Sequence, residues 1–225
     1  MRTKVLLGSA GLRLCSLLVA LAPAAQSAAA TLEVSVTDEQ GRPVAHVAVY
    51  ITAVNAAPEA LRTPTAVMDQ QDKQFLPHML VVQTGTSVQF PNHDDVSHHV
   101  YSFSRAKSFE LGLYKGQAYP PVVFDVAGTV VLGCNIHDGM LGYIKVVDTP
   151  HFALTNDEGV ALIDGLPDAE YTLEVWTPRL RENALPAPRS LVVASGQAPP
   201  VAVQLTGRLA PEHSHGKSSL SWDRY

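Results

Sequence analysis

Cysteine, aromatic side chains and charges are all scarce in this chain. Of its 225 residues, two are cysteine, 7% are aromatic and 16% are charged. Two cysteines form one bridge at most, which excludes a disulfide-rich scaffold. The formal net charge of −5 at pH 7 disfavours nucleic acid as a partner, because a phosphate backbone attracts a basic surface. The 46% of hydrophobic residues is typical of a globular protein with one or two domains.

Helical signals are missing as well: we find no amphipathic helix of ordinary length, no helical repeat and no phosphate-binding glycine loop. Short runs of alternating apolar and polar residues recur instead between turns that contain Gly or Pro, which predicts an all-β protein of the sandwich type. The segments expected to form strands are 32–37, 44–50, 65–68, 79–83, 86–90, 98–103, 108–114, 122–125, 129–132, 142–147, 152–163, 171–176, 189–193 and 201–205.

The first thirty residues differ from the rest of the chain. Arg2 and Lys4 precede an apolar run that ends in the small residues 28–30, an arrangement typical of a secretory signal. A retained membrane anchor is the alternative, but the apolar run is short and lacks a stop-transfer flank. We therefore expect residues 1–30 to be a cleaved signal peptide, a mature periplasmic protein that begins near Thr31, and no membrane span in that protein.

Removal of the signal peptide would leave Cys134 as the only cysteine. Cys15 lies inside the signal, and lipidation there is disfavoured because Leu14 occupies the preceding position, where a lipoprotein signal has a small residue. An unpaired thiol in a compartment that favours disulfides needs protection, and metal ligation provides it. A buried structural cysteine is the alternative interpretation of Cys134.

One short loop carries three side chains that can bind a metal. Cys134, His137 and Met140 follow the apolar run 129–132 and precede the alternating run 142–147, so the loop should join two strands. A thiolate, an imidazole and a thioether within seven residues can converge on one ion, and soft sulfur with imidazole favours copper over the hard cations. The loop is therefore a candidate copper site.

A blue-copper site needs a second imidazole, and His98 at the start of the expected strand 98–103 can supply it. The ordered set of His98, Cys134, His137 and Met140 resembles the cupredoxin family of the plastocyanin and amicyanin type, over about residues 62–148. The whole chain is similar to periplasmic proteins labelled as methylamine-utilisation cupredoxins. The resemblance implies a Greek-key β-sandwich with one type 1 copper ion, three equatorial ligands (His98, Cys134 and His137) and Met140 as the weak axial ligand.

The residue after His98 departs from the family pattern. Many cupredoxins have Asn there, where it ties the two ligand loops together, and this chain has His99. Neighbours on a strand face opposite sides, so His99 should point away from His98. The other candidate ligands are interpreted as solvated loop, strand or tail residues: His46, His93, Asp94, Asp95, Glu110, His213 and His215.

The segments on either side of the cupredoxin-like region suggest a second domain. Residues 152–176 resemble the later strands of the carboxypeptidase regulatory-like sandwich, whose first strands look like residues 32–50. We therefore predict a cupredoxin copper-binding domain inserted into this second sandwich, with the two crossings, 58–64 and 147–151, close together. The predicted parts of the mature chain are 62–148 for the copper domain, 31–61 plus 149–206 for the second sandwich and 207–225 for a disordered tail.

The resemblance implies a protein that carries single electrons and catalyses no reaction. A redox partner, such as a cytochrome or a dehydrogenase, would dock transiently near His137. A copper oxidase or nitrite-reductase-like enzyme would need further His ligands, and a two-copper electron centre would need a second cysteine. A periplasmic copper carrier or storage module stays open as the alternative, and a purely structural β-protein is disfavoured because all four ligand types occur in order.

Overall fold

The computed structural model describes residues 29–55, 57, 59–116 and 119–211. Apart from the short 3-10 helix η1 (Glu182–Ala184), the regular elements of this part are all strands, so the predicted all-β class is confirmed. No helix among the described residues is long and apolar enough to cross a membrane. Residues 1–28, with Cys15, and the tail residues His213 and His215 lie outside the described part.

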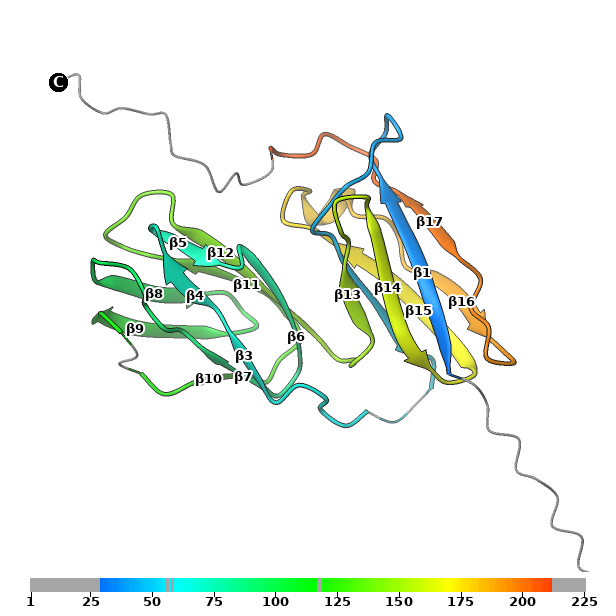
Figure 1. The fold of residues 1–225 in the computed structure, drawn as a ribbon, viewed down its shortest axis with the longest axis horizontal. Coiled ribbons are helices and arrows are strands. Elements are labelled where there is room, and N and C mark those ends of the chain that lie inside the picture. Colours follow the sequence, from blue (N-terminus) through cyan, green and yellow to red (C-terminus); the bar gives the residue numbers. More distant parts are fainter. Residues whose placement is uncertain (1–28, 56, 58, 117–118, 212–225) are drawn as a thin grey trace, which may run out of the picture.

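The strands form two sandwiches that lie side by side (Figure 1). The first sandwich pairs a five-stranded sheet, in the order β6-β12-β11-β8-β9, with a three-stranded sheet, in the order β10-β7-β3. The sheets enclose one apolar core, to which Phe124, Leu132 and Ile144 contribute fully buried side chains. The strand bounds are β3 (Thr65–Val67), β6 (Met79–Gln83), β7 (Thr86–Gln89), β8 (His98–Phe103), β9 (Ser108–Tyr114), β10 (Val122–Phe124), β11 (Gly128–Gly133) and β12 (Leu141–Val147).

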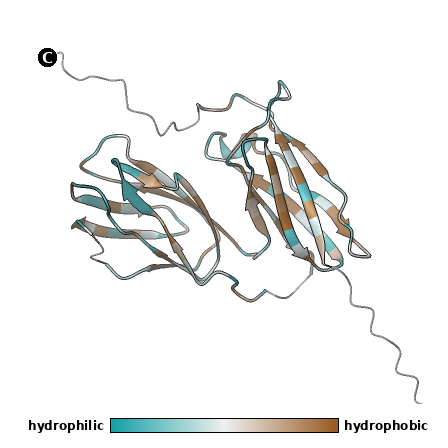
Figure 2. Ribbon diagram, in the orientation of Figure 1, coloured by the Kyte–Doolittle hydropathy of each residue, from teal (hydrophilic) through white to brown (hydrophobic). Residues whose placement is uncertain are grey.

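The second sandwich pairs a three-stranded sheet, β14-β1-β17, with a four-stranded sheet, β13-β2-β15-β16. Figure 2 shows hydrophobic and hydrophilic residues alternating along its strands, as expected when one face of each sheet is buried. Leu32, Ile51 and Leu173 lie in the core between the sheets. The strand bounds are β1 (Ala30–Thr37), β2 (Ala48–Ala53), β13 (Phe152–Leu154), β14 (Val160–Leu166), β15 (Ala169–Trp176), β16 (Arg189–Val193) and β17 (Val201–Gln204).

The two N-terminal strands pair with strands from the C-terminal third of the chain. β1 lies antiparallel to β14 and parallel to β17, and β2 lies antiparallel to β13 and β15. All strands of the first sandwich therefore fall between β2 and β13 in the sequence (Figure 1). Independent folding of the predicted parts, 62–148 and 31–61 plus 149–206, stays a prediction.

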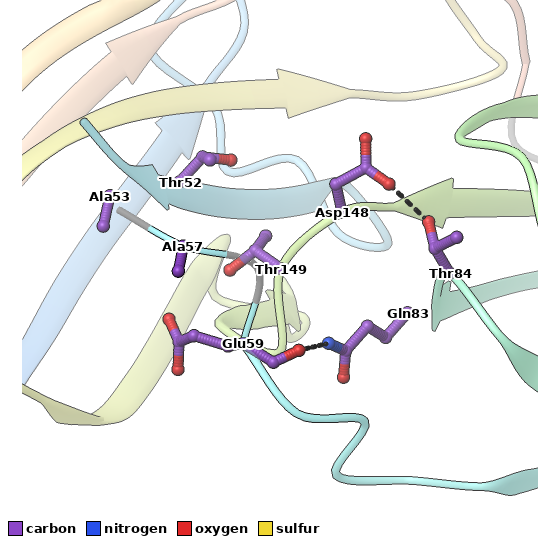
Figure 3. A pocket seen from close by; sticks show the side chains of 8 residues that line it. All are labelled: Thr52, Ala53, Ala57, Glu59, Gln83, Thr84, Asp148 and Thr149. Atoms are coloured by element: carbon purple, nitrogen blue, oxygen red, sulfur yellow. Dashed lines mark hydrogen bonds between the residues drawn. The ribbon is translucent and has the colours of Figure 1, made fainter. Parts of the chain in front are cut away.

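The two chain crossings between the sandwiches touch each other. His151 Nε2 lies 3.0 Å from a carboxylate oxygen of Glu59, so the expected proximity of the crossings is observed. A cavity of about 480 Å³ opens beside them, as Figure 3 shows. Two hydrogen bonds join residues that line this cavity: Gln83 Nε2 donates to the Glu59 carbonyl at 3.1 Å, and Thr84 Oγ1 donates to Asp148 at 2.5 Å.

A small apolar cluster joins the sandwiches beyond the crossings. Met79 and Val147 of the first sandwich pack with Trp176 of the second. The Lys145 ammonium lies 5.6 Å from the centre of the Tyr50 ring and 5.5 Å from that of Trp176, within range for cation–π attraction. Burial lowers the pKa of Lys145 and raises the pKa of Tyr50, as expected for ionisable groups taken from water.

Several sequence-based boundaries need correction. The strand expected over 44–50 starts only at Ala48, because His46 adopts a left-handed conformation with φ of +55° that interrupts an extended strand. The run 152–163 is divided by a turn into β13 and β14. Ala30, which the sequence analysis places at the end of the signal peptide, is buried and pairs with Leu166 in β1, and the cleavage site stays a prediction. Residues 207–211, assigned to a disordered tail, are partly held by hydrogen bonds, such as that from the Ala210 amide to Arg179.

A two-stranded hairpin was also missed by the sequence analysis. It consists of β4 (Asp69–Gln71) and β5 (Gln74–Leu76). Its two-residue loop has positive φ at both Asp72 and Lys73, the conformation of a type I′ turn. The Asn-Gly or Asp-Gly pair that normally marks this turn is absent, so the sequence offered no signal for it.

Candidate metal centre

Three side chains of the first sandwich converge on one point. His98, Cys134 and His137 each offer one ligand atom within 4.8 Å of the other two. The Cys134 sulfur is 3.9 Å from the His98 nitrogen and 3.8 Å from the His137 nitrogen. The two imidazole rings are 4.7 Å apart at an angle of 62°. Three of the four predicted ligands are thus close enough to share one ion.

The strand pairing explains why residues so far apart in sequence meet. His98 opens β8, and Cys134 directly follows β11. These strands are antiparallel, with Gly133 opposite Tyr101, so the start of β8 lies beside the end of β11. Gly133 also makes room for its neighbour, because a Cβ atom there would lie only 2.7 Å from the Tyr101 ring.

A tight loop brings His137 back over Cys134. The Met140 amide donates a hydrogen bond to the His137 carbonyl at 3.3 Å, and Gly139 adopts a φ of +80° that favours glycine. The Met140 side chain is buried in the same apolar cluster as Cys134. This position agrees with the predicted axial role of Met140, which stays a prediction.

Asp94 contacts the buried imidazole of His98 at the ring nitrogen that does not face Cys134. His98 is inaccessible to solvent, and its Nε2 lies 2.7 Å from Asp94 Oδ2. If His98 Nδ1 faces the ion, Nε2 carries the proton and donates it to this carboxylate, a common support for metal-binding histidines. Burial raises the pKa of Asp94, but the hydrogen bond from His98 and one from the Lys73 amide outweigh it and lower the pKa below its ordinary value.

The interpretation of Asp94 as a solvated loop residue was therefore wrong. Its side chain is only 15% exposed, and it is the residue that orients His98. The Lys73 amide that donates a hydrogen bond to Asp94 belongs to the hairpin loop that was not predicted. The interaction could therefore not be predicted from the sequence. Only the spacing of four residues between Asp94 and His98 could have served as a signal.

Asn92 fixes the loop that precedes His98. Its buried side chain donates hydrogen bonds to the carbonyls of Val96 and Tyr114 and accepts one from the Asp94 amide. Tyr114 is held in turn by the carbonyl of Phe90. The Asn92 side-chain amide thus stabilises the loop before His98. In the family pattern the corresponding Asn directly follows the first His ligand.

His99 lies outside the cluster, as expected. Its Nε2 is 2.9 Å from Glu110 Oε1, and the strand pairing with β9 is irregular between His98 and Val100. Glu110 is 64% exposed, as expected for a strand carboxylate. His93 is exposed and contacts Asp69 in the hairpin.

The donor set fits a soft metal ion. Burial, with contributions from the nearby His98 and Lys73, lowers the pKa of His137 and favours the neutral imidazole that binds metals. Cys134 is a buried free cysteine, and one sulfur with two imidazole nitrogens is a combination that copper accepts. His137 is less buried than His98, and its neighbour Ile136 is 52% exposed.

Comparisons with known proteins give only partial similarities. No family model matches the chain, and no curated protein matches it. A purple cupredoxin from Nitrosopumilus maritimus is 20% identical, with a TM-score of 0.32 over 37% of this chain and 98% of that one. An amicyanin variant in the reduced Cu(I) form at pH 4 is 21% identical, with a TM-score of 0.34 over 44% of this chain and 99% of that one.

A copper-containing nitrite reductase from Thermus scotoductus SA-01 is also similar. It is 22% identical, with a TM-score of 0.36, and the match covers 43% of this chain and 25% of the reductase. Each of these matches covers less than half of this chain. The chemistry of the site therefore has to be inferred from its own side chains.

Proposed function

We propose that this protein is a cupredoxin-like carrier of single electrons that binds one type 1 copper ion. The observation that carries the proposal is that His98, Cys134 and His137 bring one ligand atom each within 4.8 Å of the others. A bound copper ion would supply one-electron chemistry by alternating between Cu(I) and Cu(II). The chain would supply His98, Cys134 and His137 as equatorial ligands and Met140 as the weak axial one.

The surroundings of these side chains suit electron transfer because they limit movement. Asp94 holds His98, Asn92 holds the loop before it, and the β8–β11 pairing holds the backbone beside Cys134. Side chains that stay in place while the charge of an ion changes keep the reorganisation small. A substrate does not have to enter for an electron to leave, so we propose carriage of electrons and no catalysis.

The surface near His137 is the proposed docking area for a redox partner. His137 is partly exposed, and Ile136 beside it is 52% exposed. Val96, two residues before His98, adds another exposed apolar side chain. A small apolar contact of this kind is typical of short-lived encounters with electron-transfer partners, such as a cytochrome or a dehydrogenase.

We also propose that residues 1–30 direct the protein to the periplasm. The supporting observation is the pairing of one free, buried cysteine with two imidazole nitrogens. Metal ligation would keep this thiol from oxidation in a compartment that promotes disulfide formation.

The absorption and electron paramagnetic resonance spectra of the copper-loaded protein test the proposal. We expect an intense thiolate-to-copper band with narrow hyperfine splitting, complete loss of that band in Cys134→Ser, and its retention in His99→Ala. The serine hydroxyl cannot replace the covalent thiolate, whereas His99 is directed toward Glu110. Tight Cu(I) binding without a stable coloured Cu(II) form would contradict electron transfer and favour copper carriage or storage.

A further inference from the structure

The surface of the second sandwich has a hollow, and the residues that line it are distant in sequence from the candidate metal ligands. It lies where the loop after β15 meets the chain that follows β17, and its volume is about 520 Å³. This volume is within the range of small-molecule sites in proteins. We call it the arginine hollow; its lining residues are Pro178, Arg179, Leu180, Arg181, Ala184, Arg208, Leu209, Ala210 and Pro211.

Three arginines around one hollow are unusual in a chain with a formal net charge of −5. Among the residues that the structure describes, no carboxylate forms an ion pair with Arg179, Arg181 or Arg208. By contrast, Arg42 pairs with Asp38 at 2.7 Å. The guanidinium charges at the hollow are therefore available to a ligand.

Backbone contacts hold the two sides of the hollow together. The Ala210 amide donates to the Arg179 carbonyl at 2.9 Å, and Arg179 Nε donates to the Ala210 carbonyl at 2.8 Å. The second bond uses only one of the nitrogens of Arg179 and fixes the direction of its side chain. Leu180 is buried beneath the loop and anchors it to the core of the second sandwich. The arginines are thus presented by a defined piece of backbone.

The lining also has an apolar part. Leu180, Leu209 and Pro178 can pack against the carbon skeleton of a ligand, while guanidinium groups bind carboxylate or phosphate oxygens in pairs. We propose that the arginine hollow binds a small organic or inorganic anion with at least two carboxylate or phosphate groups. This proposal goes beyond electron carriage and does not depend on copper.

Calorimetric titration of the exported protein with citrate and with inorganic pyrophosphate tests the proposal and separates carboxylate from phosphate recognition. We expect one site per chain for at least one probe, and weaker binding as sodium chloride screens the charges. The double variant Arg181→Gln with Arg208→Gln should bind at least about tenfold more weakly, because it loses two charge-assisted contacts. Both side chains are exposed, so the variant should fold normally.

Arg105→Gln is the matched control, because it removes the same charge from an exposed position in the first sandwich. It should bind the probes as the unaltered protein does. In nuclear magnetic resonance spectra of the unaltered protein, the probe should shift amide signals of residues 178–181 and 208–211. The proposal is overturned if neither probe binds, if the double variant binds as tightly as Arg105→Gln, or if the shifted signals lie elsewhere.

Discussion

The two sandwiches have similar architecture but bury different kinds of side chain. The core of the second is mainly aliphatic, with Tyr171 as its aromatic member, and the core of the first contains several aromatic rings, two methionines and Cys134. The first sandwich buries polar residues next to the candidate metal centre, among them Asn92 and His98, and others away from it, such as Gln83 at the chain crossings. Burying polar groups is costly unless they are hydrogen-bonded, so the bonds of Asn92 to Val96 and of His98 to Asp94 show which segment holds the candidate site in place.

The difference shows how one of two similar sandwiches can position a group of potential metal ligands. In the first sandwich, the start of β8 carries His98 and the loop after β11 carries Cys134 and His137. The hairpin β4–β5 supports His98 through the Lys73 amide, which is bonded to Asp94. The second sandwich has no comparable group of His, Cys, Asp and Glu side chains among the described residues. Among the described residues the candidate metal centre therefore belongs to the first sandwich, and this assignment can be tested by separating or weakening the two parts.

Production of the two sandwiches as separate chains should have the largest effect on copper binding. A chain of residues 62–148 should fold and bind copper alone, because it contains all strands of the first sandwich and all four predicted ligands. A second chain, in which a short Gly/Ser linker replaces this segment, should unfold cooperatively without binding copper. Circular dichroism melting and copper titration measure both. If both chains fail to fold, the two sandwiches form a single merged domain.

Selective destabilisation is the next test. Phe124→Ala should destabilise the first sandwich by about 3–5 kcal/mol, and Leu173→Ala should destabilise the second by about 2–5 kcal/mol, because each removes a fully buried side chain. Copper should raise the unfolding temperature of the transition that Phe124→Ala lowers and leave the other unchanged. Calorimetry with and without copper checks this. An equal shift of both transitions by copper would contradict independent sandwiches.

Asp94→Asn should have a smaller effect, which is confined to copper binding at the candidate metal centre. The amide keeps the size of the side chain but loses the charge that holds His98 Nε2–H, so copper affinity should fall about 10- to 100-fold. Asp95→Asn is the matched control, since Asp95 is exposed and adjacent. Competition with a copper chelator measures the change. Equal copper affinities of the two variants would show that Asp94 does not support His98.

The lowered pKa of Asp94 adds a pH dependence to the same experiment. A carboxyl group whose folded pKa lies below its unfolded value stabilises the fold above the unfolded pKa, and this contribution disappears as pH falls through the folded pKa. The metal-free protein should therefore lose stability in acid, below about pH 4, and Asp94→Asn should lose less than the unaltered protein.

Met140 should produce the smallest change, a shift in reduction potential without loss of the metal. Met140→Leu should raise the potential and Met140→Gln should lower it, because an axial ligand tunes a blue-copper site to which it binds weakly. Cyclic voltammetry of the two variants measures the shifts. Unchanged potentials in both would exclude Met140 as the axial ligand.

The parts of this structure that could be predicted from the sequence are those with local signals. Cys134, His137 and Met140 lie within one loop, and the alternating strands have a period of two, so both were recognisable. His98 was inferred from the need for a second imidazole and from the family resemblance, because no local pattern links it to Cys134, which lies 36 positions away. The sequence contains no comparable pattern for contacts between distant segments.

The missed features depend on such contacts or on single backbone angles. Asp94 contacts His98 and is held there by the Lys73 amide, which comes from the loop of an unmarked hairpin. Residues 207–211 appear polar and unstructured in sequence, yet Ala210 is held by Arg179 from the loop after β15. His46 interrupts an alternating run through a backbone conformation that the pattern does not encode. In each case a tertiary contact or a backbone angle overrides the local pattern.

X-ray absorption spectroscopy of the copper-loaded protein, in both oxidation states, tests the central claim most directly. We expect one short copper–sulfur bond from Cys134 and two nitrogen ligands from His98 and His137, with little change of these distances on reduction. Cys134→Ser should lose the short sulfur contact, and His99→Ala should keep all three ligands. A copper ion bound only by nitrogen and oxygen, or a coordination that rearranges strongly on reduction, would contradict a type 1 electron-transfer centre.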